Sequence, residues 1–269
     1  MASAARSGTV MANGARLYYE KAGAGPTALF IAGSTGDAGN FTRAADLLAD
    51  EFTVVTYDRR SNSRSPRPSR WTTTSVSEQA DDAAALIREL ALAPVALFAA
   101  SAGALIGLDL VIRHPELVRV AVLQEPLIYP LVPLELLASR RALVQEAMKA
   151  GGPRAAVEDL LRHLNDDKVL EAIPADVLAR MLGNADTILT IETAFAAWQP
   201  REDDLASLRV PVVLVIARDT LPPYRHVMTW LEARLGTKAI VVNGPHGFYY
   251  YRPQDLADVV RPIFRSAPA

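Results

Sequence analysis

Ser101 stands in a segment whose residue types suit a nucleophilic serine. A short apolar run precedes it and a predicted helix follows, so it falls at a sharp strand-to-helix turn. Such a turn strains the serine backbone and lifts its hydroxyl above the end of the sheet. Ala99, Ala102 and Gly103 are the small neighbours that this close contact needs, although Ala99 replaces the first glycine of the usual G-x-S-x-G pattern. The alternative is an ordinary turn in which Ser101 caps the helix.

A serine hydroxyl needs a base to become nucleophilic near neutral pH, and His246 is the best placed of the four histidines. It lies in the loop Asn-Gly-Pro-His-Gly, directly after a predicted strand and shortly before the last predicted helix. Catalytic loops follow the carboxyl ends of such strands. His114, His163 and His226 fall in predicted helices or at their ends, where capping or packing is expected. We therefore predict His246 as the general base.

Acyl transfer also requires two N–H donors for the oxyanion that develops on the substrate. Ala102, at a helix N-terminus directly after the serine, offers one of them. The loop Gly33-Ser34-Thr35-Gly36 follows a predicted buried strand and offers the other, from Gly33 or Ser34. Its glycines let the backbone approach a substrate closely. The alternative is a strand-end loop without a role in chemistry.

Two carboxylates compete for the place beside His246, where a carboxylate holds the imidazole tautomer and stabilises the imidazolium. Asp219 follows a late predicted strand, but it lacks the glycine of the usual G-x-x-D spacing and is one residue short of it. Glu125 leaves an earlier strand end close to Ser101, and its longer side chain can reach the histidine. A buried ion pair is the non-catalytic alternative for Glu125. We favour Glu125 as the acid and keep Asp219 as the alternative.

Short apolar strands alternate with helices along most of the chain, which predicts an α/β fold with a mostly parallel sheet and helices on both faces. A hairpin is expected at residues 10–19, and further strands at 27–32, 52–57, 95–100, 118–123, 211–217 and 239–242. Helices are expected at 41–50, 75–92 with Ser77 near its start, 104–113, 224–235 and 253–264. Only helical segments fill residues 127–204, at 134–149, 153–164 and 175–182. We interpret them as a helical cap inserted into a core of residues 1–126 and 205–269.

The composition narrows the classes of protein that fit. Half of the 269 residues are hydrophobic and 22% are charged, so a sizeable core can be buried. The net charge of −2 gives no electrostatic case for a nucleic-acid or acidic membrane partner. Without cysteine, disulfides, thiolate nucleophiles and cysteine metal sites are excluded. Neither a signal peptide nor a membrane span is predicted, and we interpret the protein as cytoplasmic.

The whole chain resembles enzymes of the α/β-hydrolase fold. Residues 57–65, Tyr-Asp-Arg-Arg-Ser-Asn-Ser-Arg-Ser, are similar to the D-x-R-G-x-G-x-S loop of many of them, with Ser61 and Ser63 in place of the glycines. The turn at Ser101 and the segment Gln-Glu-Pro at 124–126 resemble a less common branch. That branch includes actinobacterial hydrolases and, more distantly, the fungal lactone hydrolases that open zearalenone. In those lactone hydrolases the acid is a glutamate at the position of Glu125.

The resemblance implies a serine hydrolase that cleaves a carboxylic ester or lactone through an acyl-enzyme. Ser101, Glu125 and His246 would form its triad, with Gly33 and Ala102 as oxyanion donors. No metal or organic cofactor is implied. The expected partner is a small-molecule ester or lactone, and a homodimer is one alternative for the oligomeric state. The fold also hosts lyases, cyclases, cofactor-free peroxidases and ligand-binding receptors, but a receptor need not retain the triad residue types present here.

Three further expectations concern segments outside the triad. Arg59 and Arg60 are expected to form surface ion pairs, with contact to a polar substrate as the alternative. The aromatic run at residues 248–251 is expected to pack in the core, with some of its rings beside the pocket. The cap is expected to form the roof of the pocket and to determine the substrate.

Overall fold

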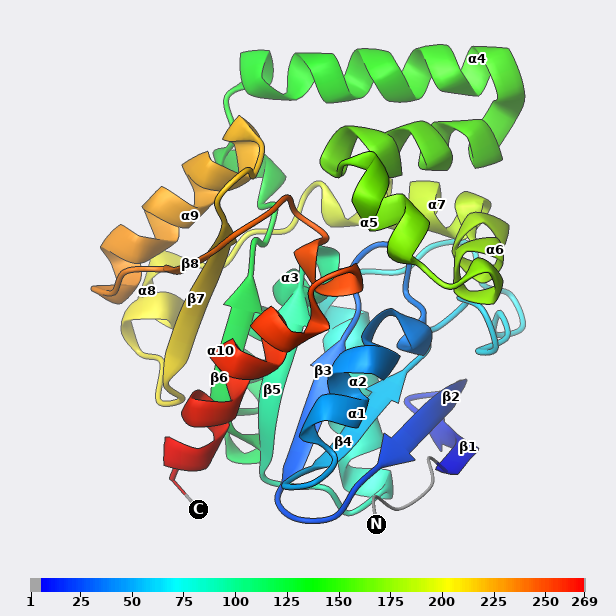
Figure 1. Ribbon diagram of the computed structural model, residues 1–269. Coiled ribbons are helices and arrows are strands. Elements are labelled where there is room, and N and C mark those ends of the chain that lie inside the picture. Colours follow the sequence, from blue (N-terminus) through cyan, green and yellow to red (C-terminus); the bar gives the residue numbers. More distant parts are fainter. Residues whose placement is uncertain (1–5, 269) are drawn as a thin grey trace.

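The computed structural model describes residues 6–268, and within them eight strands form a single sheet in the order β1-β2-β4-β3-β5-β6-β7-β8 (Figure 1). β2 runs antiparallel to its two neighbours, and the pairs from β4 to β8 are parallel. The strands are β1 (Arg6–Ala12), β2 (Ala15–Ala22), β3 (Thr27–Ile31), β4 (Thr53–Tyr57), β5 (Val95–Ala100), β6 (Val118–Gln124), β7 (Val212–Ala217) and β8 (Ile240–Val242). The mostly parallel α/β sheet predicted from the sequence is confirmed.

The first hairpin turns at Asn13-Gly14, as the sequence predicts. Both residues have positive φ, 46° and 74°, which is the backbone of the two-residue turns that match the twist of paired strands. The hairpin begins earlier than predicted, since β1 starts at Arg6.

Helices cover both faces of the sheet. On one face lie α2 (Val76–Glu89), α3 (Ala102–Arg113) and α9 (Pro222–Leu235), and on the other lie α1 (Thr42–Leu48) and α10 (Pro253–Ser266). Alternate side chains of β3 point to opposite faces of the sheet. Leu29 and Ile31 pack in the core beneath α2 and α3, and Ala28 and Phe30 pack in the core beneath α1 and α10. Strands buried on both faces explain the continuous apolar runs in the sequence.

A helical insertion separates β6 from β7. It contains α4 (Leu134–Leu164), α5 (Asp167–Ala172), α6 (Ala175–Gly183), α7 (Ala185–Phe195) and the short α8 (Glu202–Ala206). We call α4 to α7 the cap. Gly152, with φ of 72°, and Pro153 interrupt α4, so its two arms fold back on each other beyond one end of the sheet (Figure 1). The break separates two helical stretches close to those predicted at 134–149 and 153–164.

Several predicted boundaries move by a few residues. The helix predicted at 75–92 does begin at Ser75, whose hydroxyl accepts a hydrogen bond from the Glu78 N–H at 3.0 Å, but it ends at Glu89. α5 and α7 had no counterpart in the sequence analysis.

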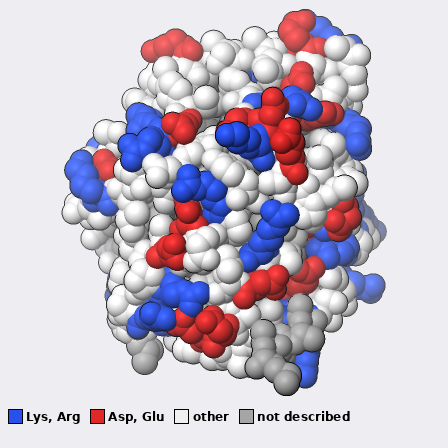
Figure 2. All heavy atoms as spheres, viewed as in Figure 1, with Lys and Arg blue, Asp and Glu red and all other residues white. Residues whose placement is uncertain are grey.

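The surface carries charges of both signs. On the face shown in Figure 2, basic and acidic side chains are interspersed, and neither sign dominates. Between residues 6 and 268, no helix is both long and apolar enough to cross a bilayer.

Candidate active site

Ser101 occupies a strained turn between β5 and α3. Its φ of 55° and ψ of −123° lie in a region that residues with a side chain rarely adopt, and such strain is characteristic of functional sites. Ser101 is the N-cap residue of α3, but its side chain makes no capping hydrogen bond. Its N–H donates to the Gln124 carbonyl at 2.7 Å, which joins the ends of β5 and β6. The serine is therefore held by the backbone, and its hydroxyl is left for another role.

Two glycines of α3 make this turn sterically feasible. A Cβ on Gly103 would lie 2.5 Å from the carbonyl oxygens of Ile31 and Ala32, so only glycine fits there. A Cβ on Gly107 would lie 2.9 Å from the Cβ of Ala99. The alanine that replaces the usual first glycine at position 99 is thus accommodated because the facing position on α3 has no side chain.

Glu125 and His246 are paired in a buried site. Nδ1 of His246 is hydrogen-bonded to Oε2 of Glu125, and the two residues are 5% and 0% exposed. The other oxygen, Oε1, accepts the Ala217 N–H at 2.7 Å, and the Gln124 side-chain amide donates to Oε2 at 2.9 Å and to the His246 carbonyl at 3.1 Å. The carboxylate is therefore fixed between the ends of β6 and β7 and the loop after β8.

Asp219 lies apart from this pair. It is exposed, and its N–H donates to the Gly244 carbonyl at 3.1 Å. Of the two carboxylates that compete in the sequence, the structure brings Glu125 and not Asp219 to the imidazole. Glu125 also has positive φ, 50°, like Ser101 at the neighbouring strand end.

The loop after β3 packs directly against Ser101. A Cβ on Gly33 would lie 3.1 Å from the Ser101 Cβ and 3.7 Å from its Oγ, so the backbone of Gly33 approaches the serine closely. The Gly33 carbonyl accepts from the Gly36 N–H at 2.9 Å and from Nη2 of Arg59 at 2.6 Å. Since a trans peptide is planar, with its C=O and N–H opposed, the Ser34 N–H points away from Arg59.

Arg59 and Arg60 are buried, so the predicted surface ion pairs are wrong. Arg59 is 1% exposed and also donates to the Ser34 carbonyl at 3.1 Å and to Gln79 at 2.7 Å, and burial lowers its pKa to about 10. Arg60 is 4% exposed and forms ion pairs with Asp82 and Glu78. The sequence pattern missed this because burial of a guanidinium depends on hydrogen-bond partners that are distant in the chain.

A small cavity joins Ser101, His246 and the loop at Gly33. Its volume is about 40 Å³, and its walls are mostly aliphatic and aromatic. The cap contributes Val157, Leu160, Leu161, Leu164 and Ile188, and the run after His246 contributes Tyr249 and Tyr250. The cap therefore roofs the site, and Phe248 packs in the core. A larger hollow of about 640 Å³ lies near the amino ends of β3 and β5, away from Ser101.

Ser101 and His246 line the same cavity. Within residues 6–268, their side chains are not hydrogen-bonded to each other. Catalytic hydrogen bonds often tighten only when a substrate binds. Within the same residues, no three histidine, aspartate or glutamate side chains converge as a metal site would require.

The sequence analysis missed several polar residues of the site, among them Tyr224, Arg140 and Glu192. Tyr224 and Arg140 line the cavity, and Glu192 on α7 lies behind Arg140 as its ion-pair partner. Glu192 also accepts hydrogen bonds from the hydroxyls of Ser34 and Tyr129. Arg140, Ser34 and Tyr129 keep the pKa of Glu192 below its usual value despite burial. These residues belong to no sequence motif. Only Tyr224 could have been suggested by its position, because it lies in the first turn of the helix after β7 and therefore near the strand ends that carry the site.

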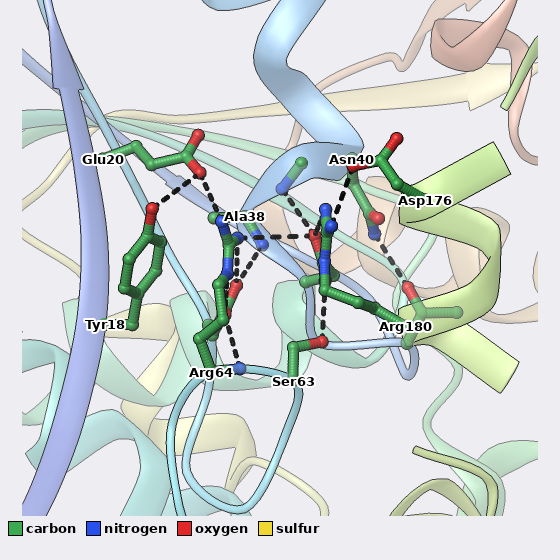
Figure 3. A network of polar contacts seen from close by, with 12 residues as sticks. Tyr18, Glu20, Ala38, Asn40, Ser63, Arg64, Asp176 and Arg180 are labelled. Atoms are coloured by element: carbon green, nitrogen blue, oxygen red, sulfur yellow. Dashed lines mark hydrogen bonds and ion pairs between the residues drawn. The ribbon is translucent and has the colours of Figure 1, made fainter. Parts of the chain in front are cut away.

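Polar contacts tie the cap to the core at two places. Arg180 of α6 donates to Asp37 at 2.7 Å, and the same carboxylate accepts from the Ser63 hydroxyl at 2.6 Å (Figure 3). The Asn184 amide donates to Ser63 Oγ at 2.9 Å, and its oxygen accepts the Ser63 N–H at 2.7 Å. On the other side, Asn165 accepts the N–H of Gly247, next to the imidazole, at 2.6 Å.

These features lead to a family assignment. A family model described as the alpha/beta hydrolase family matches residues 28–259. The chain belongs to this family. The more specific likeness to the zearalenone lactone hydrolases stays a prediction.

Relatives in the family are hydrolases by name. The chain is 36% identical over 179 residues to an uncharacterized hydrolase, YraK, of Bacillus subtilis; this covers 66% of the chain and 64% of YraK, so less than two thirds of that protein is matched. It is 30% identical over 249 residues to the putative carbamate hydrolase RutD of Azorhizobium caulinodans, which covers 89% of the chain and 91% of that protein.

Solved structures share the fold. Est816, described as an N-acyl homoserine lactone degrading enzyme, superposes with a TM-score of 0.75 at 20% identity, covering 95% of the chain and 99% of Est816. At this identity the likeness concerns the fold alone.

Proposed function

We propose that the protein is a serine hydrolase that cleaves a carboxylic ester or lactone, with Ser101 as nucleophile, His246 as general base and Glu125 as the acid. The observation that carries the proposal is the buried Glu125–His246 pair, which opens onto the same cavity as the strained Ser101. A carboxylate on Nδ1 leaves Nε2 as the nitrogen that faces the reaction.

The reaction begins when the Ser101 oxygen attacks the substrate carbonyl and its proton passes to Nε2 of His246. The C–O bond to the leaving group then breaks, and the leaving oxygen takes that proton, which leaves an acyl group on Ser101. Water, activated by the same imidazole, releases the acid and restores the serine. Glu125 stabilises the imidazolium that forms in each half of the cycle.

The oxyanion is assigned to two N–H groups beside Ser101. Ala102 offers one at the N-terminus of α3. From the loop after β3, the Ser34 N–H is favoured over that of Gly33, because Arg59 and Gly36 hold the Gly33 carbonyl and thereby direct the Ser34 N–H away from Arg59.

An ester or lactone substrate suits the largely apolar cavity beneath the cap, which favours a hydrocarbon acyl portion. The lactone-degrading activity named for Est816 shows that this fold can host lactone cleavage, and the carbamate activity named for RutD defines the competing class. A substrate panel should therefore contain aliphatic esters, lactones and a carbamate of equal chain length. Faster turnover of the carbamate would contradict the assigned class.

A fluorophosphonate probe tests the nucleophile directly. We expect the intact mass of the wild-type protein to increase by one phosphonyl group, and the Ser101→Ala variant to remain unmodified while it folds normally. Absence of an adduct on the wild type, or the same adduct on Ser101→Ala, would contradict the proposal.

A further inference from the structure

Tyr224 lies beside both side chains that are assigned to the chemistry. Its ring stacks on the imidazole of His246 with centroids 4.4 Å apart and an angle of 37° between the ring planes. All three side chains line one cavity, and the Ser101 side chain lies close enough to the phenol to lower its pKa. Tyr224 is 2% exposed, so its position is fixed by packing within α9.

Arg140 controls the direction of the tyrosine proton. Its Nη1 donates to the Tyr224 oxygen at 3.3 Å, and Glu192 holds the other end of the guanidinium. A guanidinium has no acceptor, so the phenol can only accept from Arg140, and its own O–H is left to donate elsewhere. Tyr224 lines the cavity beside Ser101, so a substrate oxygen bound there would lie within reach of this O–H.

The surroundings also keep the phenol protonated. Burial is the main cause that raises the pKa of Tyr224 to about 12, while Arg140 acts in the opposite direction. A neutral phenol that accepts from a cation is a stronger donor than an isolated one, because hydrogen bonds in a chain polarise one another.

From this geometry we infer that Tyr224 is a catalytic residue that donates a hydrogen bond to the leaving-group oxygen, and that the Arg140–Glu192 pair positions it. The inference rests on the proposed function and deepens it. Tyr224 covers the imidazole of His246, and this imidazole delivers the proton to the leaving group. The leaving-group oxygen is therefore the substrate atom that we expect the Tyr224 hydroxyl to meet.

The protons balance without a second acid. When the tetrahedral intermediate collapses, the C–O bond breaks and its electron pair stays on the leaving oxygen, which receives the proton from Nε2 of His246. Tyr224 keeps its own proton throughout and stabilises the negative charge that develops before the transfer is complete. This help matters most for an alkoxide leaving group and least for an acidic phenol. The structure therefore assigns alkyl esters and lactones as the substrate class, in preference to activated aryl esters.

The test compares two leaving groups on one acyl chain. Tyr224→Phe keeps the aromatic ring over His246 and removes the hydroxyl. We would measure kcat/KM, which reports acylation, on ethyl butyrate and p-nitrophenyl butyrate. We expect a fall of roughly 10- to 100-fold on the ethyl ester, as for a lost transition-state hydrogen bond, and a change of less than about 3-fold on the aryl ester.

Tyr57→Phe is the matched control, because Tyr57 is also buried and its hydroxyl has no hydrogen-bond partner among the described residues. It should leave both rates unchanged.

Two results for Tyr224→Phe would overturn the inference. An equal fall on both esters would make Tyr224 a structural support for Ser101, and no fall on either ester would show that its hydroxyl has no role in the reaction. A wild type that is active on the aryl ester but inert on every alkyl ester would refute the leaving-group role alone. A wild type that takes up no fluorophosphonate would refute the proposed function itself.

Discussion

Glu125 Oε2 is hydrogen-bonded to Nδ1 of His246 although the two residues are 121 positions apart in the chain. The pair forms because β6 and β8 end at the same edge of the sheet, with β7 between them. The backbone N–H of Ala217, at the end of β7, occupies the second carboxylate oxygen at 2.7 Å. Glu125 therefore occupies the place beside His246 that an acidic side chain from the loop after β7 could have taken. Asp219, in that loop, is exposed.

Glu125→Gln should lower kcat by about 10⁴-fold, because the amide cannot stabilise the imidazolium and can favour the wrong tautomer. Asp219→Asn should change kcat by less than about 2-fold, since the side chain is exposed and, within residues 6–268, has no hydrogen bond to the imidazole. Both variants keep the shape of the side chain, and their Tm values would show that they are folded. The opposite ranking of kcat would return the role of the acid to Asp219.

Patterns along the chain were sufficient for the fold and for the strand ends that carry Ser101 and Glu125. Apolar runs locate parallel strands, and the residues that follow such strands gather at one edge. Arg59 was misjudged because its partners, Gln79 and the Gly33 carbonyl, meet it only in the folded chain. Arg140 and Glu192 were missed for the same reason. They lie on cap helices, where the sequence alone does not distinguish a buried charged residue from a solvent-exposed one.

Arg59 and Arg60 are adjacent, buried and differently bonded, so their lysine variants form a matched pair. Arg59→Lys should lower kcat at least about 10-fold with little change in KM, because a single ammonium nitrogen cannot span the acceptors that Nη1 and Nη2 of Arg59 reach separately, Gln79 and the two loop carbonyls. Arg60→Lys should lower stability, by about 1–2 kcal/mol from the loss of its bidentate contact with Asp82, and leave kcat unchanged. Steady-state kinetics and thermal unfolding of both variants measure this. Equal kcat values in the two variants would mean that Arg59 does not position the Ser34 N–H as the proposed oxyanion donor.

Ser61 and Ser63 have left-handed backbones, with φ of 64° and 48°, where the related motif has glycine. Among residues 6–268, Ser61 Oγ is buried without a hydrogen-bond partner, whereas Ser63 Oγ joins Asp37 to Asn184 of the cap. Ser61→Gly should therefore stabilise the protein by about 1 kcal/mol and raise Tm by about 2–4 °C. Ser63→Gly relieves the same strain but loses the contact with the cap, so its Tm should stay level or fall. Calorimetry in which both variants gain equal stability would show that the Ser63 hydroxyl does not help to dock the cap.

Tyr224 should remain a donor well above the pH at which tyrosine normally ionises, about 10. Burial disfavours the phenolate and is the main cause that raises the pKa of Tyr224 to about 12. The charge of Arg140 lowers this pKa, whereas the charges of Glu192 and Glu125 raise it further. The proton is therefore lost only as the pH rises through about 12. We expect kcat/KM on ethyl butyrate to stay level from about pH 8.5 to about pH 10.5. A decline centred near pH 10 that disappears in Tyr224→Phe would contradict this assignment.

Leu161 on α4 should determine the length of the acyl chain that the cavity accepts. It is 7% exposed and lines the cavity of about 40 Å³, which is far below the volume of about 300 Å³ at which ligand pockets usually begin. Leu161→Ala would enlarge the cavity, and kcat/KM for p-nitrophenyl octanoate should rise relative to the butyrate by about 10-fold. Leu182→Ala is the control, because Leu182 lies in the cap with the same exposure and does not line the cavity. Both substitutions should cost about 2–5 kcal/mol of stability, so a general loosening of the cap would affect them alike. If the ratio of octanoate to butyrate rates shifts equally in both variants, cap mobility and not the shape of the cavity wall selects the chain.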